Sequence, residues 1–263
     1  MRRAGTLLVI VGLLLLVWSA PTHPGPKPPD VLRMGIANLS ATNSHPKLAS
    51  QVLAKTEVDI LLLQEWTGHN VSASALQNAG LQFVLSDARR GTHGAALLAT
   101  SSIVEAAQVV SPPWDGSCSM PIVTARIRVG EKRVGLLGIH APPPTPPCWR
   151  SREPYLKAIS DLIDKGAITQ RLGVLRPGLP AILIDDVNAL GWELDMMHES
   201  GLSDAFSKGS WRLGPTWTPH PWLPALARID HFWAPDRWPI KGTWSVALPG
   251  SDHRALLTDL AKQ

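Results

Sequence analysis

From residue 31 onward the chain alternates short apolar runs with polar segments rich in Gly, Pro, Asn and Asp. Runs this short, with many branched aliphatic residues and turn-forming residues at both ends, are typical of buried β-strands. The predicted strands are 31–36, 58–63, 81–85, 94–100, 103–110, the two arms of a hairpin over 122–140, 181–184, 228–233, 242–248 and 255–260.

Apolar residues recur at helical spacing in a few longer segments. In 152–165, for example, Tyr155 and Ile159 fall on one face of a helix. The predicted helices are 45–56, 72–79, 152–165 and 193–199, while residues 207–227 show neither pattern. Many strands, few helices and no regular alternation between them predict a layered α/β fold of the α+β kind, with mixed sheets covered by helices.

The N-terminus has the pattern of a targeting segment. Arg2 and Arg3 precede an unbroken apolar run over 7–18, which is short for a membrane span and typical of a signal-peptide core. A signal peptidase would cut after Ser19 or Ala20, but Trp18 and Pro21 are unfavourable neighbours for such a cut. Whether the segment is cleaved or retained as an anchor therefore stays open. We therefore expect a protein that is either secreted or anchored on the outer face of the cytoplasmic membrane. The expected parts are a signal peptide or N-terminal membrane anchor, a proline-rich linker and one large domain, at 1–20, 21–29 and 30–263.

The two cysteines fit an exported protein. Cys118 precedes the predicted hairpin over 122–140 and Cys148 follows it, so both lie at its open end. A disulfide between them is expected in an oxidising compartment. Neither belongs to a paired Cys/His motif, which argues against a zinc site.

The net charge is small. The chain carries 25 basic and 21 acidic residues, a formal charge of +4. Residues 1–20 hold two arginines and no acidic residue, so the rest of the chain has a charge of +2. Such a balance disfavours tight binding to duplex nucleic acid, which depends on neutralising phosphates.

Polar residues follow the predicted strands where the apolar runs stop. They are Asn38, Glu65, His140, Asp186, Asn188, Asp230, Asp252 and His253. Each alone is explained by turn chemistry, since Asp and Asn favour turns and helix caps. Their repetition at several strand ends instead predicts a catalytic site. Glu65, Asp252 and the amide of Asn38 are hard oxygen ligands, suited to Mg²⁺ or Mn²⁺ rather than to zinc.

Six short motifs give the chain a resemblance to a known family. They are Ile-Ala-Asn at 36–38, Leu-Leu-Gln-Glu at 62–65, Gly-Ile-His-Ala-Pro at 138–142, Ile-Asp-Asp-Val-Asn at 184–188, Arg-Ile-Asp-His at 228–231 and Gly-Ser-Asp-His at 250–253. In this order and spacing they resemble the endonuclease/exonuclease/phosphatase superfamily, over residues 31–262. The resemblance implies a DNase I-like four-layer sandwich of two mixed sheets flanked by helices. It also implies that Glu65 is the principal metal ligand, assisted by Asn38 and Asp252.

The resemblance also implies roles for the other strand-end residues. Asp186 would position or deprotonate the attacking water, and Asn188 would hold a phosphate oxygen. His253 would contact the scissile phosphate while Asp230 orients its ring. His140 would supply a second phosphate contact or a proton donor. The reaction implied is in-line attack of water on phosphorus.

Three positions depart from the family pattern. Asp185 and Val187 stand where the family usually has a glycine and an aromatic residue, and Ser40 is a weaker metal ligand than the usual Asp. The charge of Asp185 would raise the pKa of Asp186 or help to bind a second cation if it faced the site. The alternative is that Asp185 points to solvent.

The substrate class stays open at this stage. The motifs are most similar to an exported or membrane-anchored bacterial branch of the family, some members of which act on lipid phosphates. Trp211, Trp217 and Trp222 precede the Asp230 strand and suit a membrane interface, base stacking or packing of their own loop. Three hypotheses remain. The first is a phosphoesterase that acts on a lipid or other small phosphoester and can contact a membrane surface. The others are a secreted nuclease acting on nucleic acid and a non-catalytic binding module. No protein partner is inferred.

Overall fold

The computed structural model describes the chain from Ser19 to Lys262 with a few short gaps. The described residues are 19–100, 102–112, 118, 120–188, 191–210, 213–220 and 223–262. The expected targeting segment over 1–20 therefore lies almost wholly outside the described residues. Within the described ranges, no helix combines the length and the apolar character needed to cross a bilayer.

The first of two six-stranded sheets, sheet A, is built from both ends of the chain. Its strand order is β13-β14-β1-β2-β4-β3. Strands β1 and β2 are parallel and the other neighbours are antiparallel, so the sheet is mixed. Its strands are β1 (Val31–Asn38), β2 (Ile60–Gln64), β3 (Gln82–Asp87), β4 (Ala95–Ala99), β13 (Ile240–Ala247) and β14 (Arg254–Ala261).

The second sheet, sheet B, comes from the middle of the chain. Its order is β11-β12-β10-β7-β6-β5, with β7 and β10 parallel. Its strands are β5 (Val104–Val110), β6 (Ile122–Val129), β7 (Lys132–His140), β10 (Ala181–Asp186), β11 (Leu202–Asp204) and β12 (Asp230–Pro235), and a separate small hairpin is formed by β8 (Ile163–Asp164) and β9 (Ala167–Ile168).

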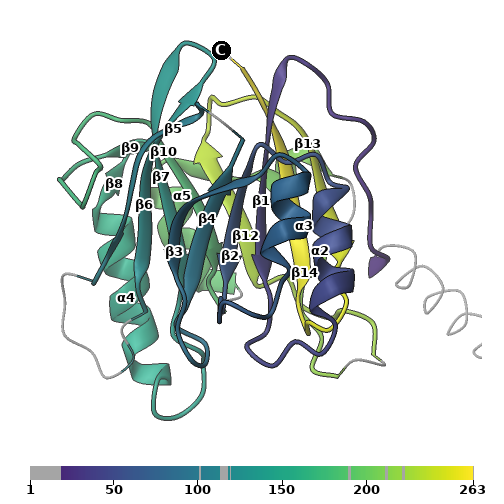
Figure 1. The fold of residues 1–263 in the computed structure, drawn as a ribbon. Helices are drawn as coiled ribbons and strands as arrows, with labels where there is room; N and C mark the ends of the chain where they lie inside the picture. The colour runs from purple at the N-terminus through teal and green to yellow at the C-terminus, as the bar shows by residue number, and fades with distance from the viewer. Residues whose placement is uncertain are drawn as a thin grey trace, which may run out of the picture.

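Helices cover the outer face of each sheet, so the molecule has four layers (Figure 1). Helices α2 and α3 pack on sheet A, and α4 and α5 pack on sheet B. The helices are α2 (Pro46–Ala54), α3 (Ala73–Asn78), α4 (Trp149–Asp161), α5 (Asp195–Glu199) and α6 (Ala205–Gly209), with a 3-10 turn, η1 (Gly191–Leu194). This architecture confirms the predicted class, two mixed sheets flanked by helices.

The inner faces of the sheets form the main core. Ile36 and Leu62 of sheet A meet Ile184 and Phe232 of sheet B there, all fully buried. Gly138 lets the two sheets pack closely, since a Cβ atom at this position would lie 2.7 Å from Cδ2 of Leu62. Because side chains alternate along a strand, the residues two positions beyond the core residues also point between the sheets.

The structure changes several predicted boundaries. The helix predicted over 152–165 is α4 and ends at Asp161, because Lys165 and Gly166 adopt positive φ (48° and 73°) and turn the chain into the β8–β9 hairpin. The predicted strand over 228–233 begins only at Asp230. Strand β11 and helix α6 were not predicted, and α6 occupies the start of the segment 207–227.

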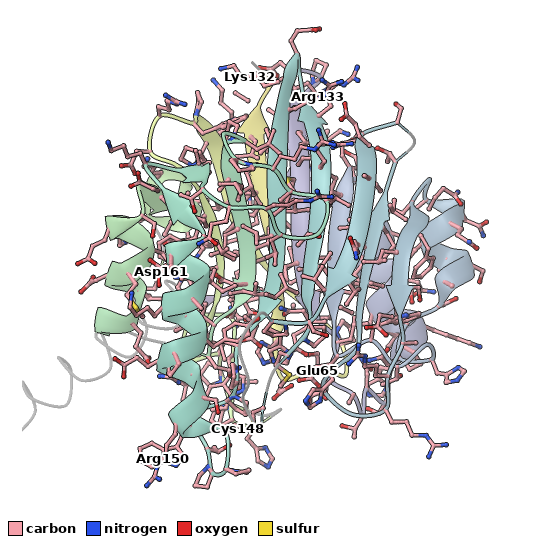
Figure 2. The ribbon with its side chains drawn as sticks, turned by 90° about the vertical axis from the view of Figure 1, so that its left-hand side faces the viewer. Glu65, Lys132, Arg133, Cys148, Arg150 and Asp161 are labelled. Carbon is pink, nitrogen blue, oxygen red and sulfur yellow. A yellow bond between two sulfur atoms is a disulfide. The ribbon has the colours of Figure 1, made fainter. Side chains whose placement is uncertain are left out.

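The predicted disulfide is present. Cys118 and Cys148 are bonded, with their Cα atoms 5.4 Å apart. The bond joins the segment before β6 to the start of α4. Figure 2 shows Cys148 near the same end of the molecule as Glu65, with Lys132 and Arg133 at the opposite end.

Residues 19–30 form a strap along the edge of sheet A. At its start, Nη1 of Arg254 donates to the carbonyl oxygen of Ser19 (2.6 Å). Midway, Thr22 and Ser245 of edge strand β13 exchange two hydrogen bonds, from the Thr22 amide to the Ser245 carbonyl (2.7 Å) and from the Ser245 amide to the Thr22 hydroxyl (3.0 Å). The expected linker therefore packs against the domain.

Candidate active site

The strand ends converge because of the sheet topology. In each sheet two parallel strands end side by side, β1 with β2 and β7 with β10. In register, Asp186 at the end of β10 stands between His140 of β7 and Asp230 at the start of β12. The polar residues that follow apolar runs in the sequence therefore come to one edge of both sheets.

Asn38 links the two sheets at this edge. Its Nδ2 donates to Oε1 of Glu65 (3.2 Å) and to Oδ2 of Asp186 in the other sheet (3.0 Å). Its Oδ1 accepts from the Ser40 amide (3.0 Å). The amide is buried and fixed at both ends, so it holds two carboxylates from different sheets next to each other.

Glu65 is directed into the site by its backbone. It follows β2 with φ of 53°, a left-handed conformation that a non-glycine residue rarely adopts. Its Oε2 accepts from the amide of Ala41 (2.8 Å), while Oε1 faces Asn38. Asn70 donates to the Glu65 carbonyl oxygen (2.7 Å) and supports this turn.

His253 and Asp230 form a buried charged pair. Nδ1 of His253 lies 2.9 Å from Oδ2 of Asp230, and Nε2 lies 3.7 Å from Oδ2 of Asp186. Burial alone would lower the pKa of His253, but the charges of Asp230 and Asp186 and the hydrogen bond to Asp230 raise it to about 10. The pKa of Asp186 is also raised, by burial and by Asp230, against the opposing effect of His253. The ring is thus held as an imidazolium between two carboxylates.

His140 and Asn188 complete the surroundings of Asp186. Nε2 of His140 lies 3.6 Å from Oδ2 of Asp186. The backbone amide of Asn188 donates to Oδ1 of Asp186 (3.1 Å), and its side chain donates to the carbonyl oxygen of Ala141 (3.2 Å). The Asx turn that the sequence left open is therefore formed, and the same turn brings Asn188 to the site.

Asp252 stands apart from this hydrogen-bonded cluster. Its side chain is exposed, and Oδ2 accepts from the indole nitrogen of Trp217 at 3.3 Å. Trp217 is half-buried and its backbone bridges to His253, which favours a packing role for this tryptophan. Trp211 and Trp222 lie outside the described residues.

Asp185 lies behind the site. It points to the opposite face of β10 from Asp186, because successive side chains alternate. It is fully buried among residues packed under α4, including Tyr155, whose pKa is raised by burial and then by the charge of Asp185. Burial, followed by the nearby Asp186, raises the pKa of Asp185 well above its usual range. The interpretation that Asp185 points to solvent is wrong, and it does not face the site.

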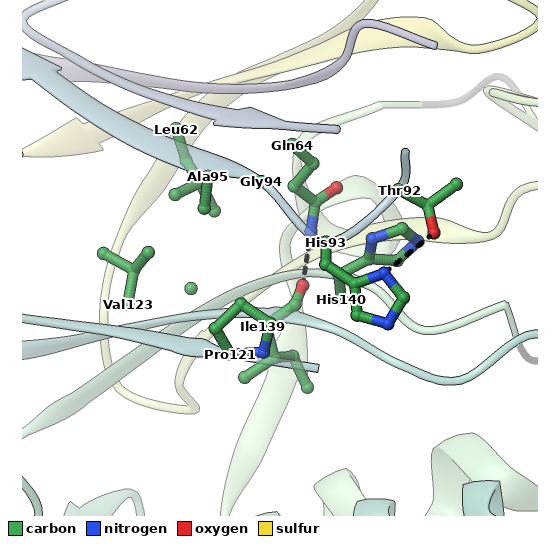
Figure 3. A pocket seen from close by; sticks show the side chains of 11 residues that line it. Leu62, Gln64, Thr92, His93, Gly94, Ala95, Pro121, Val123, Ile139 and His140 are labelled. Carbon is green, nitrogen blue, oxygen red and sulfur yellow. Dashed lines mark hydrogen bonds between the residues drawn. The ribbon is translucent and has the colours of Figure 1, made fainter. Parts of the chain in front are cut away.

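His93 is a candidate site residue that the sequence reasoning missed. With Thr92 and His140 it lines a small cavity of about 10 Å³ beside the site (Figure 3). Burial, then His140, lowers the pKa of His93, while Glu65 acts in the opposite direction. His93 follows no strand, so only its position in a Gly-flanked loop between β3 and β4 could have indicated it.

A divalent cation fits this group of residues. Asp186, Asp230 and His253 each offer a ligand atom, all within 4.8 Å of one another. Oδ1 of Asp230 is buried without a hydrogen-bond partner, and Asn38 Nδ2 occupies a position between two carboxylates. Because His253 is held as an imidazolium by Asp230 and Asp186, we expect carboxylate oxygens rather than this ring to bind the ion, and Glu65 supplies one beside Asp186 through the shared Asn38 amide. Such oxygen ligands suit Mg²⁺ or Mn²⁺.

Comparison with known proteins gives one family and one fold. The model of the Endonuclease/Exonuclease/phosphatase family matches residues 32–253. A family protein from Bacteroides thetaiotaomicron is similar in structure, with 16% identity, a TM-score of 0.67 and coverage of 89% of this chain and 98% of its own. The mannosyl-6-phosphatase Bt3783 of Bacteroides thetaiotaomicron VPI-5482 is also similar in structure, with 16% identity, a TM-score of 0.66 and coverage of 88% of this chain and 99% of its own. D. rerio TDP2 complexed with single strand DNA product has 15% identity, a TM-score of 0.62 and coverage of 88% of this chain and 98% of its own. Among curated protein sequences, none matches this chain.

Proposed function

The chain belongs to the Endonuclease/Exonuclease/phosphatase family, and we propose that it is an exported phosphoesterase acting on a lipid phosphate. Members of this family are metal-dependent hydrolases of phosphoester substrates, and this chain is such an enzyme. The proposal concerns the export, the lipid substrate and the roles of individual residues.

The observation that carries the proposal is the link between the two sheets through Asn38. One amide holds Glu65 of sheet A and Asp186 of sheet B within hydrogen-bond distance. Nε2 of the His253 imidazolium lies 3.7 Å from Oδ2 of Asp186, the same oxygen that Asn38 contacts. Negative and positive groups thus face one small volume, as required for a cation and a phosphate that bind together.

We assign the cation to Glu65, assisted by Asn38. The ion, Mg²⁺ or Mn²⁺, would neutralise charge on the phosphate and activate the nucleophile. Asp252, which the family resemblance also suggests as a ligand, contacts Trp217 instead. Its carboxylate would have to rotate toward the site to take part.

The remaining polar groups act on water and phosphate. Asp186 accepts a proton from, or orients, the attacking water, with Asn38 and the Asn188 amide fixing its two oxygens. His253, charged because Asp230 lies against it, binds a phosphate oxygen as charge develops during in-line attack. The side-chain amide of Asn188 donates one hydrogen to the Ala141 carbonyl, and its second hydrogen would bind a second phosphate oxygen.

Three observations support export and a lipid substrate. The disulfide between Cys118 and Cys148 is consistent with an oxidising, extracellular compartment. The small net charge does not favour tight binding to nucleic acid. The large apolar side chain of Trp149 is about half exposed next to Cys148, at the end of the molecule that holds Glu65 (Figure 2).

The test compares two phosphoesters under the same conditions. Purified full-length protein is incubated with Mg²⁺ or Mn²⁺ and either a polyprenyl pyrophosphate in detergent or plasmid DNA. We expect phosphate release from the lipid, which EDTA abolishes. Replacement of His253 or Glu65 by Ala should reduce the rate by about 10²–10⁴-fold.

A neighbouring histidine provides the control. His69 is exposed on the loop after β2 and lies outside the described cluster, so His69→Ala should retain the wild-type rate. DNA nicking that both active-site changes abolish, without lipid turnover, would replace the proposal with a secreted nuclease. A folded protein silent on every phosphoester would favour a non-catalytic binding module.

A further inference from the structure

We propose that the apolar segment before Ser19 stays attached as a membrane anchor and that the active-site face lies against the bilayer. The lipid substrate in this inference rests on the proposed function, whereas the orientation on the membrane is independent of catalysis. The inference comes from the direction of the strap, residues 19–30, and from the side chains around the site.

The strap begins at the active-site end of the domain. Its first described residue, Ser19, accepts from Arg254, which directly follows His253. The carbonyl oxygen of its last residue, Asp30, accepts from the amide of Lys262, which directly follows the far end of β14 (2.9 Å). The chain therefore runs along the whole edge of sheet A, and whatever precedes Ser19 leaves the domain beside the site.

The strap is held along its length, so this exit point is fixed. Nη1 of Arg33 donates to the carbonyl oxygen of Gly25 (3.1 Å), and the Lys27 amide donates to Oε2 of Glu57 (2.7 Å). The Lys27 side chain also pairs with Asp59. A free tether would let the domain take any orientation to a membrane, whereas a strap fixed at several points allows few.

The sequence before the strap suits a retained anchor. It is uncharged and predominantly apolar from residue 4 to Ser19, and bears two arginines before that. Its length approaches the lower limit of about 17 residues for a membrane-spanning helix. The bulky Trp18 next to the expected cleavage point disfavours removal by a signal peptidase.

Exposed apolar side chains flank the site. Leu226 is 63% exposed, and its amide donates to the carbonyl oxygen of Trp217, which in turn bridges to His253. On another side, Trp149 is 53% exposed, and Cζ of the Arg150 guanidinium lies 5.1 Å from the centroid of the Trp149 ring. Aromatic and basic side chains of this kind are enriched where a protein meets lipid headgroups.

Basic charge alone does not set the orientation. Arg150 lies at the active-site end, but Lys132 and Arg133 lie at the opposite end (Figure 2). Among the described residues, the exposed large apolar side chains are Leu48, Val84, Trp149, Leu213 and Leu226, so the β6–β7 turn around Glu131 contributes none. Trp149 and Leu226 place apolar exposure at the active-site end, where the anchor leaves the domain.

The orientation can be measured with one fluorophore at either end. The described cysteines are both in the disulfide, so a new thiol at Leu226→Cys or at Glu131→Cys takes the label selectively. Full-length protein carrying His253→Ala is reconstituted into vesicles of equal parts phosphatidylcholine and phosphatidylglycerol. An environment-sensitive label such as nitrobenzoxadiazole should brighten about twofold or more at 226 and stay unchanged at 131.

Two further results decide the inference. Brightening at 131 or at neither position would overturn it, and so would an intact mass of the exported protein that lacks residues 1–18. Leu226→Glu should slow hydrolysis of a phospholipid substrate in the same vesicles about tenfold, while hydrolysis of soluble p-nitrophenyl phosphate stays constant. Val84→Glu, on the edge of sheet A, is the matched control and should alter neither rate.

The outcomes separate the orientation from the function. If the label at 226 brightens but the active protein turns over no phosphoester, the proposed function fails and the membrane orientation stands. If the protein hydrolyses soluble phosphoesters but the label at 226 stays dim, the orientation fails and the phosphoesterase stands.

Discussion

Replacing Asp230 by Asn tests whether one buried carboxylate keeps His253 charged. The change preserves the size of the side chain and an oxygen that can still accept from Nδ1, but it removes the negative charge 2.9 Å from the ring. Both residues are buried, so solvent screens their attraction weakly. The variant should therefore affect the pKa of His253 more than it affects the packing.

The size of the effect follows from the geometry. The pKa of His253 is raised from 6.5 to about 10, a difference worth about 5 kcal/mol. Two opposite charges 2.9 Å apart at an effective dielectric constant near 20 attract by about 6 kcal/mol. Asp230 is thus the largest cause of the rise, but Asp186 is also needed, because the two charges together must offset the burial that lowers the pKa of His253. We expect the pKa of His253 to fall by about two pH units or more in the variant.

The assay is an NMR titration of His253 in metal-free protein, together with a pH–rate profile. Activity that needs the imidazolium is lost as pH rises through its pKa, so the alkaline limb should lie near pH 10 in the wild type and shift to lower pH in the variant. The stability that this pair contributes is complete below pH 6.5 and disappears as pH approaches 10. Asp252→Asn is the control, because this neighbouring carboxylate is exposed and makes the smallest contribution. A pKa that moves equally in both variants, or in neither, would refute the reasoning.

Three further changes test other parts of the structure. Arg33→Met should lower the free energy of unfolding in urea by about 3–5 kcal/mol, since it leaves Asp259 buried without its two-point partner. Adding Asp259→Leu should recover most of the loss, and failure to do so would contradict this account. Replacing Cys118 and Cys148 by Ser should lower the free energy of unfolding by about 3–4 kcal/mol, because the bridge spans 30 residues. An unchanged urea midpoint would contradict this expectation. His93→Ala should raise KM about tenfold with little change in kcat if this ring contacts substrate, and a fall in kcat alone would exclude that role.

The strand ends of the site could be predicted because strands have a simple local signature. An apolar run that stops at Asn38, Asp186 or His140 indicates both the strand and the polar residue that its end presents. The two parallel pairs then bring these ends to one edge, which is a property of the topology rather than of any single residue. The disulfide was predictable for a related reason, since Cys118 and Cys148 flank one hairpin.

Other parts of the site depend on side-chain direction and loop geometry, which the sequence pattern does not specify. Because side chains alternate along β10, Asp185 points under α4 while Asp186 points into the site. Which of the two faces the site depends on the pairing of β10 with its neighbours, which is set by contacts across the sheet. The carboxylate of Asp252 turns to an indole that is distant in sequence. His93 reaches the site because Gly94 lets the loop pass close to Trp66, where a Cβ atom would lie 1.8 Å from the carbonyl oxygen.

The strap also covers part of an open sheet edge. Strand β13 is an outer strand of sheet A, and an outer strand with free amides and carbonyls is a template for pairing with another chain. Thr22 occupies the amide and carbonyl of Ser245 on that strand. A chain shortened to begin at Val31 would uncover this edge and could associate through it. The strap therefore also blocks strand pairing at the part of this edge around Ser245.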